Sequence, residues 1–224
     1  LLDRVGHHAA NRRDWLNKAA ETKAFVQGRV EKKLEPQLAW LSAIRKALPD
    51  DGIFVEELTQ MGYVARHAFP VFKPHTYLTP GYQGTLGWGI ATALGAAHAR
   101  RDVPVVSISG DGGAMFTIAE LATAVQHKIP VTIVIFSDNA FGNIKRFQLE
   151  KFGDRTIASD LVNPDFVRLG ESFGIASRQV ETVGEFSDAL EESIGSEEPR
   201  IIVVPVGDFP SPWEFEFLPK VRGS

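Results

Sequence analysis

Two acidic turns, at Asp111 and Asp138, are the part of this 224-residue sequence best suited to chemistry. Each follows a short apolar segment rich in β-branched residues. Gly110-Asp111-Gly112 also precedes a helix-forming segment, so its backbone N–H groups and the helix dipole favour a bound phosphate. A carboxylate beside a phosphate is repelled unless a cation lies between them, and Mg²⁺ is the hard cation that such oxygen ligands prefer. The pattern therefore predicts a magnesium-bound phosphate group.

Each acidic turn also has a simpler interpretation. Asp is a favoured N-cap residue, so Asp111 could serve only to cap the following helix. Asp138-Asn139 could be an ordinary turn after a strand. The glycines around Asp111 favour the phosphate interpretation, because a side chain at Gly110 or Gly112 would keep a diphosphate away from the backbone N–H groups. Gly113 extends the same surface.

Alternating strands and helices must position these turns. Strands are predicted at 53–56, 76–79, 105–109, 131–137 and 200–205, and helices at 58–68, at 87–99, from Asn163-Pro164 onward and from Thr182 onward, where Glu185 completes a capping box. Buried β-branched runs separated by a helix are typical of a parallel sheet covered on both faces. The sequence therefore predicts an α/β fold, a three-layer parallel sheet with helices on both faces. Ligands bind such sheets beyond the carboxyl ends of the strands, where both acidic turns lie.

The ends of the chain are predicted to lie outside this domain. Residues 11–34 form an amphipathic pattern with Trp15 and Val26 on one stripe, and Pro36 is suited to the first turn of a second helix. The predicted organisation is a linker helix at 1–35 from a missing upstream region, a ligand-binding domain at 36–212 and a C-terminal tail at 213–224. The first Met is Met61, from which we expect that an upstream region has been removed.

Composition excludes several function classes. The formal net charge of −4 provides no basic surface for nucleic acid, and no apolar run is long enough to span a bilayer. The chain has no Cys, so disulfides and thiolate metal sites are excluded. The six His residues show no metal-ligand spacing. We expect a cytoplasmic protein that binds neither nucleic acid nor membranes.

Two segments together resemble a known family. Gly110-Asp111-Gly112 with the turn at Asp138 is similar to the diphosphate-binding motif of thiamine diphosphate (ThDP) enzymes, and TPGYQGTLGWGIATALGAA at 79–97 resembles the loop under the cofactor in the acetolactate synthase and benzoylformate decarboxylase branch. The similarity runs from about Leu34 to Pro212, in the order of the C-terminal, diphosphate-binding domain. It implies the ThDP-binding fold, ThDP and Mg²⁺ as cofactors, and a 2-oxo acid substrate that is decarboxylated or ligated to a second carbonyl compound.

The resemblance also implies metal ligands. Asp111 is the first, and counting back from Gly142, which matches the family's glycine, makes Asp138 the second and the Ala140 carbonyl the third. The family usually has two Asn at this turn, so Asp138 adds a negative charge. Asn139 is the alternative ligand if the register shifts by one residue.

The remaining cofactor contacts are also carried over from the resemblance. The Gly84 carbonyl is expected to accept from the aminopyrimidine, and Leu86 to wedge the pyrimidine against the thiazolium, although Leu86 could be an ordinary core residue. Gln60 is expected to contact the diphosphate and Ile144 to pack on the cofactor. The full predicted cofactor-binding set is Gln60, Gly84, Thr85, Leu86, Gly110, Asp111, Gly112, Gly113, Asp138, Ala140, Gly142 and Ile144.

Partners follow from the same resemblance. The glutamate that activates the cofactor is expected in a pyrimidine-binding domain of the same or a neighbouring chain, so no catalytic residue is predicted in this sequence. A homo-oligomer is expected. Two alternatives stay open: a Rossmann-like dinucleotide-binding module, favoured by the glycines at 81–89, and a non-catalytic scaffold subunit that keeps the fold. The first lacks a Gly-x-Gly-x-x-Gly motif with its downstream acid.

Overall fold

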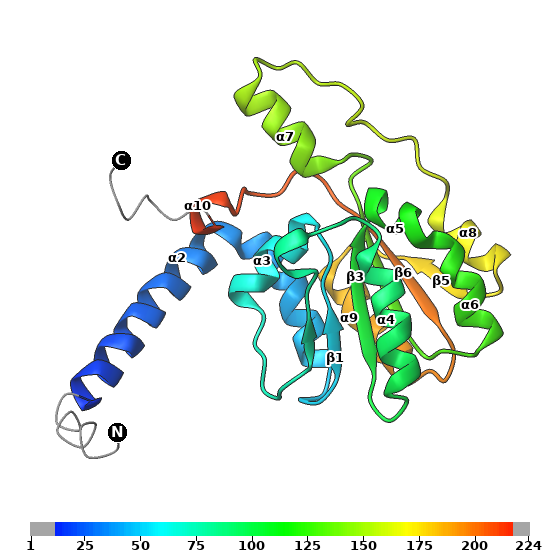
Figure 1. The fold of residues 1–224 in the computed structure, drawn as a ribbon, viewed down its shortest axis with the longest axis horizontal. Helices are drawn as coiled ribbons and strands as arrows, with labels where there is room; N and C mark the ends of the chain where they lie inside the picture. The colour runs from blue at the N-terminus through cyan, green and yellow to red at the C-terminus, as the bar shows by residue number, and fades with distance from the viewer. Residues whose placement is uncertain (1–11, 217–224) are drawn as a thin grey trace. The chain divides into compact units, whose positions relative to one another are not determined.

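The computed structural model describes residues 12–216, and the chain divides into two compact units. One unit comprises Pro36–Phe209 and holds the sheet (Figure 1). The other comprises the residues up to Glu35 together with those from Pro210 onward. The predicted tail from residue 217 and the first eleven residues lie outside the described part of the chain.

The N-terminal helix α2 (Arg12–Ala47) is a single element with an internal break. Leu34 has non-helical dihedral angles (φ −114°, ψ 20°), and Pro36 follows within the helix. Proline has no N–H to donate and its ring crowds the preceding turn, so the break falls where the sequence predicts two helices to meet. Trp15 and Val26, on the predicted apolar stripe, are exposed.

All six strands of the sheet are parallel. The strands are β1 (Ile53–Val55), β2 (Tyr77–Leu78), β3 (Val105–Gly110), β4 (Thr132–Ser137), β5 (Ala176–Gln179) and β6 (Arg200–Pro205). They lie in the order β2-β1-β3-β4-β6-β5. The chain leaves β1 for the edge strand β2 and then returns to the other side of β1 as β3. The order therefore reverses between β1 and β3, the kind of position at which α/β sheets bind ligands.

Helices connect the strands and cover both faces, which confirms the predicted α/β fold. They are α3 (Gln60–Ala68), α4 (Trp88–Ala99), α5 (Asp111–Thr117), α6 (Leu121–Gln126), α7 (Gly142–Lys151), α8 (Phe166–Ser172) and α9 (Val183–Ile194), with 3₁₀ turns η2 (Gly81–Gln83) and η3 (Ile118–Glu120). Helix α10 (Trp213–Glu216) follows the last strand and belongs to the other unit. Figure 1 shows α4 and α5 in front of the sheet and α9 behind it.

The core has two layers because alternate strand residues point to opposite faces. On one face, Ile133, Ile135 and Val203 pack with Ile90 of α4 and Leu121 of α6 in one buried cluster. Gly and Ala residues in α4 let this helix approach the sheet closely.

On the other face, an aromatic group joins α2, β4 and α9. The Trp40 ring lies 6.1 Å from the Phe136 ring and 5.2 Å from the Phe186 ring, and Phe136 and Phe186 lie 6.2 Å apart. Phe186 is fully buried. The capping box predicted at the start of α9 is present: Thr182 Oγ1 accepts the Glu185 N–H, and the Glu185 side chain accepts N–H groups in return.

Strand β5 and helix α7 are among the elements that were not predicted from the sequence. Strand β5 is mostly exposed at the sheet edge, and its sequence, ASRQ, carries no alternating apolar pattern. Helix α7 has no buried residue and a largely polar sequence. Within residues 12–216, no helix is both long and apolar enough to cross a bilayer.

Candidate functional site

The acidic side chains that follow β1, β3 and β4 share one edge of the sheet. These strands are neighbours, and Gly110, the last residue of β3, pairs with Phe136 near the end of β4. Asp111 and Asp138 therefore follow the carboxyl ends of adjacent strands. The edge that the sequence predicts for a ligand is the edge where the two carboxylates come together.

Asp111 is the most constrained residue of the site. It is 1% exposed and is the first residue of α5, so the N-cap position belongs to Gly110. Its Oδ1 accepts from the Gly112 N–H at 2.7 Å. Its Oδ2 accepts from Ser137 Oγ at 3.0 Å and from the Asn139 N–H at 2.7 Å. Because Oδ2 binds the turn that follows β4, Asp111 joins the two acidic turns and does more than cap its own helix.

Asp138 lies close enough to Asp111 for the charge of Asp111 to affect its ionisation. Burial raises the pKa of Asp138, and the negative charge of Asp111 raises it further. Hydrogen bonds oppose this rise: Gln60 Nε2 donates to Oδ2 at 2.8 Å, and the Ala140 N–H donates to Oδ1 at 3.2 Å. A cation between the two carboxylates would relieve their repulsion.

Gln60 connects Asp138 to a positive charge on α7. The Gln60 Oε1 accepts from Arg146 Nη2 at 3.4 Å and from the Phe209 N–H at 3.2 Å. Arg146 also donates to the Phe209 carbonyl at 2.7 Å. Arg146 is therefore held at the site, whereas Lys145 next to it forms a surface ion pair with Asp160 at 2.6 Å.

At three glycines of the site, neighbouring side chains occupy the space that a Cβ would need. A Cβ at Gly142 would lie 2.5 Å from Asp138 Oδ2, and one at Gly112 would lie 2.5 Å from Phe141 Cε1. A Cβ at Gly113 would lie 2.8 Å from Glu57 Oε1. From the sequence, the glycines at the Asp111 turn are explained by a close approach of phosphate to the backbone. In the structure, packing against neighbouring side chains is an additional reason for it at Gly112 and Gly113.

Asn163 is a site residue that sequence reasoning missed. Its Nδ2 donates to Asp111 Oδ2 at 2.8 Å and to Asn139 Oδ1 at 3.2 Å. Asn163-Pro164 was interpreted only as a helix start, but Asp165 is the residue that caps α8. Asn139 has a positive φ of 56°, which turns its N–H toward Asp111. The side chain of Asn139 is therefore tied to Asn163, whereas Asp138 directs its carboxylate toward Gln60.

The glycine-rich loop lies between β2 and α4. Gly84 follows η2, and a Cβ there would lie 2.8 Å from Leu58 Cδ1. Thr85 is exposed and Leu86 is half-buried, so Leu86 is not an ordinary core residue. Ile144 of α7 is 53% exposed. These positions leave apolar surface of Leu86 and Ile144 accessible to a ligand.

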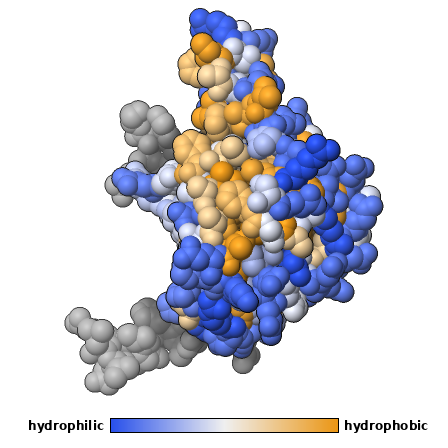
Figure 2. All heavy atoms as spheres, turned by 90° about the vertical axis from the view of Figure 1, so that its right-hand side faces the viewer, coloured by the Kyte–Doolittle hydropathy of each residue, from blue (hydrophilic) through white to orange (hydrophobic). Residues whose placement is uncertain are grey.

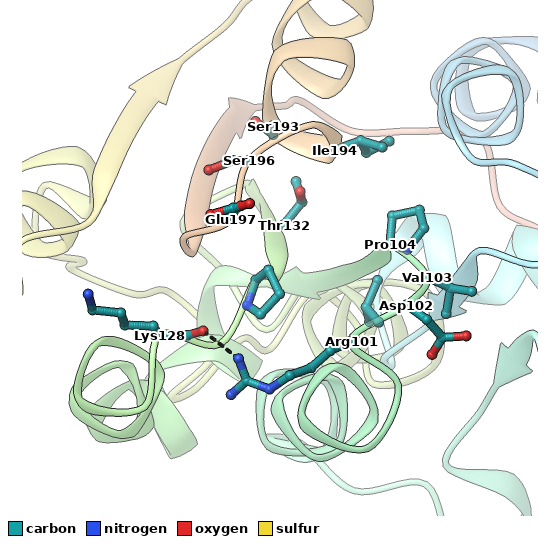
Figure 3. Close-up of a pocket in the computed structure, with 12 residues that line it drawn as sticks. Arg101, Asp102, Val103, Pro104, Lys128, Thr132, Ser193, Ile194, Ser196 and Glu197 are labelled. Atoms are coloured by element: carbon teal, nitrogen blue, oxygen red, sulfur yellow. Dashed lines mark hydrogen bonds between the residues drawn. The ribbon is translucent and has the colours of Figure 1, made fainter.

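Two hollows differ in their relation to this site. A cavity of about 50 Å³ is lined by Gln60, Gly110, Asp138 and Gly142. A larger one, of about 500 Å³, lies near the amino-terminal ends of the strands (Figure 3). There, Arg101 donates to the Lys128 carbonyl at 3.2 Å, and Asp102 and Glu197 balance the basic side chains. The larger hollow contains none of the predicted site residues, so its size does not make it the functional site.

The metal-ligand inventory is small. Within residues 12–216, no three His, Cys, Asp or Glu side chains cluster as a metal site. Two carboxylates with a backbone carbonyl can hold Mg²⁺ when substrate or cofactor phosphates complete the coordination. The Asp111 and Asp138 pair fits that arrangement, because within residues 12–216 Asp111 Oδ1 accepts only the Gly112 N–H and retains a lone pair.

Comparison with known proteins agrees with the geometry. Residues 58–204 match the sequence family described as thiamine pyrophosphate enzyme, C-terminal TPP binding domain. A probable acetolactate synthase large subunit of Methanococcus aeolicus is 37% identical over 137 residues, which cover 61% of this chain and 23% of the relative. Acetolactate synthase of Bacillus subtilis is 37% identical over 138 residues, which cover 62% of this chain and 24% of the relative.

Solved structures show the same fold. The thiamine diphosphate-dependent 4-hydroxybenzoylformate decarboxylase of Rhodococcus jostii RHA1 superimposes with a TM-score of 0.72 at 30% identity, over 78% of this chain and 33% of that one. The present chain thus spans about a quarter to a third of the length of the relatives it matches. These similarities do not favour the dinucleotide-binding alternative.

Proposed function

We propose that this chain, which belongs to the family of C-terminal TPP binding domains of thiamine pyrophosphate enzymes, is the diphosphate- and magnesium-binding part of a 2-oxo acid decarboxylase or carboligase. The relatives described as acetolactate synthases and as a benzoylformate-type decarboxylase support this class of reaction. Because the chain covers only a minor part of each relative, the reaction, substrate and partners of the whole protein are part of the proposal.

The observation that carries the proposal is the pairing of Asp111 with Asp138. Burial and the charge of Asp111 raise the pKa of Asp138, so an ionised pair is favourable only if a cation compensates its charge. Asp111 and Asp138 would hold Mg²⁺ with the Ala140 carbonyl, and the cofactor's diphosphate oxygens would complete the coordination. The Asn139 side chain is the alternative ligand, but its hydrogen bond from Asn163 makes it the less available one.

The residues of the chain bind and orient the cofactor. When bound, ThDP supplies the nucleophilic carbon and the electron sink that decarboxylation of a 2-oxo acid requires. The N–H groups at Gly110–Gly113 would receive the diphosphate, and Gln60 would orient Asp138. The Gly84 carbonyl and the half-buried Leu86 would hold the aminopyrimidine end, with Ile144 against the apolar part of the cofactor. Thr85 would contribute through its backbone.

A second domain would close the site. Exposed apolar side chains gather on α5, on α7 and on the segment after α7, namely Met115, Phe116, Ile144, Leu149, Phe152, Ile157 and Val162. Figure 2 shows a hydrophobic band across the face seen from the right-hand side of Figure 1. Contiguous apolar surface of this kind is typical of a protein interface. A pyrimidine-binding domain from the same or a neighbouring chain, in a homo-oligomer, is the partner that fits the family.

Calorimetric titration of ThDP with and without Mg²⁺ tests the cofactor proposal. We expect weak, magnesium-dependent binding by the wild-type chain and none by Asp111→Ala. An Asp165→Ala variant provides the control, because it removes a helix cap near the site without touching the carboxylate pair. Binding that persists in Asp111→Ala would exclude the proposed metal site.

An activity assay tests the need for a second domain. The chain incubated with ThDP, Mg²⁺ and pyruvate is expected to form no product, since the activating glutamate would come from the pyrimidine-binding domain. Product above the background of Asp111→Ala would show that this chain alone contains the catalytic machinery. If neither the isolated chain nor the full-length protein binds ThDP, the scaffold alternative replaces the proposal.

A further inference from the structure

Glu57 is a fully buried carboxyl group that the predicted site does not include. It lies two positions beyond the end of β1 and 0% of its surface is exposed. Burying a carboxyl group is costly unless hydrogen bonds satisfy its oxygens. Its position, between the glycine-rich loop and the Asp111 turn, indicates a specific use.

The Glu57 carboxyl group faces the N-terminus of α4. Its Oε1 accepts the backbone N–H of Gly87, the N-cap residue of α4. The N–H groups of Trp88 and Gly89 also face it, and together these donors oppose the rise in the Glu57 pKa that burial causes. The first N–H groups of a helix have no partner within the helix and carry partial positive charge. Glu57 therefore supplies the capping oxygen that Gly87 cannot supply.

The same carboxyl group touches both cofactor-binding segments. A Cβ at Gly113 would lie 2.8 Å from Glu57 Oε1, and one at Gly89 would lie 2.9 Å from Oε2. Gly113 belongs to the turn assigned to the diphosphate, and Gly89 to the helix that continues the glycine-rich loop. Ser109 Oγ lies next to Oε2 beside Gly89, although without a well-formed hydrogen bond in the described part of the chain. Glu57 thus fills the space where the two segments meet.

Thr117 binds the carbonyl side of the same residue, Gly87. Its Oγ1 donates to the Gly87 carbonyl at 3.0 Å, while Glu57 accepts the Gly87 N–H. Gly87 has a φ of 83°, which favours glycine, and a Cβ there would lie 2.7 Å from Phe116 Cβ. Thr117 and Phe116 belong to α5, the helix that begins at Asp111. The backbone of Gly87 is therefore fixed between β1 and α5.

We propose that Glu57 and Thr117 are positioning residues that set the place of the Gly84–Leu86 loop relative to the Gly110–Gly113 turn. The inference rests on the proposed function, because these two segments are the ones assigned to the aminopyrimidine and the diphosphate. A cofactor held at both ends binds well only when its two sites are kept at a fixed separation. Glu57 and Thr117 therefore contribute to affinity for the whole cofactor but not for diphosphate alone.

The test separates the two ends of the cofactor. Glu57→Asp shortens the carboxyl arm by one methylene, and Thr117→Val keeps the side-chain shape but removes the donor. Each variant is titrated with Mg²⁺ and ThDP, and separately with Mg²⁺ and inorganic diphosphate. We expect an unchanged affinity for diphosphate. In Glu57→Asp, binding of ThDP should be about tenfold weaker, which is the size of effect seen when a residue that orients a metal ligand is mutated. Thr117→Val should show a smaller loss of the same kind.

Glu185→Asp is the matched control, because Glu185 caps α9 away from the site through the N–H groups of Glu181 and Thr182. It should lower the melting temperature and leave both affinities unchanged. Amide hydrogen exchange supplies a readout that does not depend on the cofactor: residues 84–89 should exchange faster in Glu57→Asp than in the control.

The outcomes distinguish the inference from the proposed function. Wild-type affinity for ThDP in both site variants, or an equal loss for ThDP and diphosphate, would overturn the positioning role. If Glu57→Asp does not fold, Thr117→Val decides between these results. If the wild-type chain and the full-length protein both fail to bind ThDP but exchange at 84–89 still accelerates in Glu57→Asp, Glu57 positions the loop and the proposed function fails. Unchanged exchange together with absent binding in both proteins would overturn both.

Discussion

The side-chain amide of Asn163 donates a hydrogen bond to Asp111 Oδ2 at 2.8 Å, across 52 positions of sequence. The same amide donates to Asn139 Oδ1 at 3.2 Å. One residue from the loop before α8 therefore ties the end of β3 to the turn after β4. The orientation of the predicted metal ligand depends on a residue that no metal-binding pattern in the sequence identified.

Replacing Asn163 should weaken metal-dependent cofactor binding. In Asn163→Ala, Asp111 loses a hydrogen bond that orients it, and we expect about tenfold weaker binding of ThDP in the presence of Mg²⁺. Calorimetry measures this effect. Asp165→Ala controls for general damage to the loop, since loss of the α8 cap should cost about 1 kcal/mol of unfolding free energy without changing the affinity. Equal affinities in Asn163→Ala and wild type would contradict the assigned role.

Removing the charge of Asp138 should stabilise the protein when no metal is present. The pKa of Asp138 is raised by burial and by Asp111, so ionised Asp138 opposes folding at neutral pH. Because the site is partly solvated, Asp138→Asn should gain no more than about 1 kcal/mol. Thermal unfolding without Mg²⁺ measures the gain.

Mg²⁺ with ThDP should stabilise Asp138→Asn less than wild type, since fewer negative charges attract the cation. Asp160→Asn is a suitable control, because Asp160 pairs with Lys145 on the surface. A larger metal-dependent shift in Asp138→Asn than in wild type would exclude Asp138 as a ligand.

The stability of the protein should depend on the ionisation of Glu57. Burial raises the pKa of Glu57 above its ordinary value of 4.5, so the folded state binds this proton more tightly than the unfolded state. Stability from this group is therefore lost as pH rises from about 4.5 through the raised pKa. Glu57→Gln removes this titration. The unfolding free energy of the variant should therefore increase relative to that of wild type as pH rises through this range.

Urea unfolding at a series of pH values measures the Glu57 effect, and Glu185 provides a control of opposite sign. The N–H groups of Glu181 and Thr182 lower the pKa of Glu185, so its stabilisation is present above 4.5 and is lost as pH falls. The unfolding free energy of Glu185→Gln should therefore decrease relative to that of wild type as pH rises. Parallel pH profiles for Glu57→Gln and wild type would show that Glu57 titrates normally.

Truncation of the aromatic group should be the costliest of these changes. Phe186 is fully buried and its ring packs on Trp40 and Phe136, so Phe186→Ala should lower the unfolding free energy by about 3–5 kcal/mol. Phe152→Ala, at a position that is 57% exposed, should change it by no more than about 0.5 kcal/mol. Chemical denaturation of the two variants measures the contrast, and similar losses would mean that Phe152 is covered in solution.

Local patterns in the sequence were sufficient for most of the sheet. Strands β3, β4 and β6 are buried on both faces, so their β-branched residues form continuous apolar runs that need no partner to be recognised. Edge strand β5 and helix α7 carry no such pattern, because neither element has a fully buried residue.

The residue types at the site were determined by the sequence, but their partners were decided by the tertiary structure. Asp111, Asp138 and the glycines around them stand out because few residues suit a turn at the end of a buried strand. Asn163 and Glu57 do not, since Asn before Pro and Glu after a strand are common in any loop. Their roles arise when β1, β3 and β4 become neighbours, which brings groups that are distant in sequence within hydrogen-bonding range of one another.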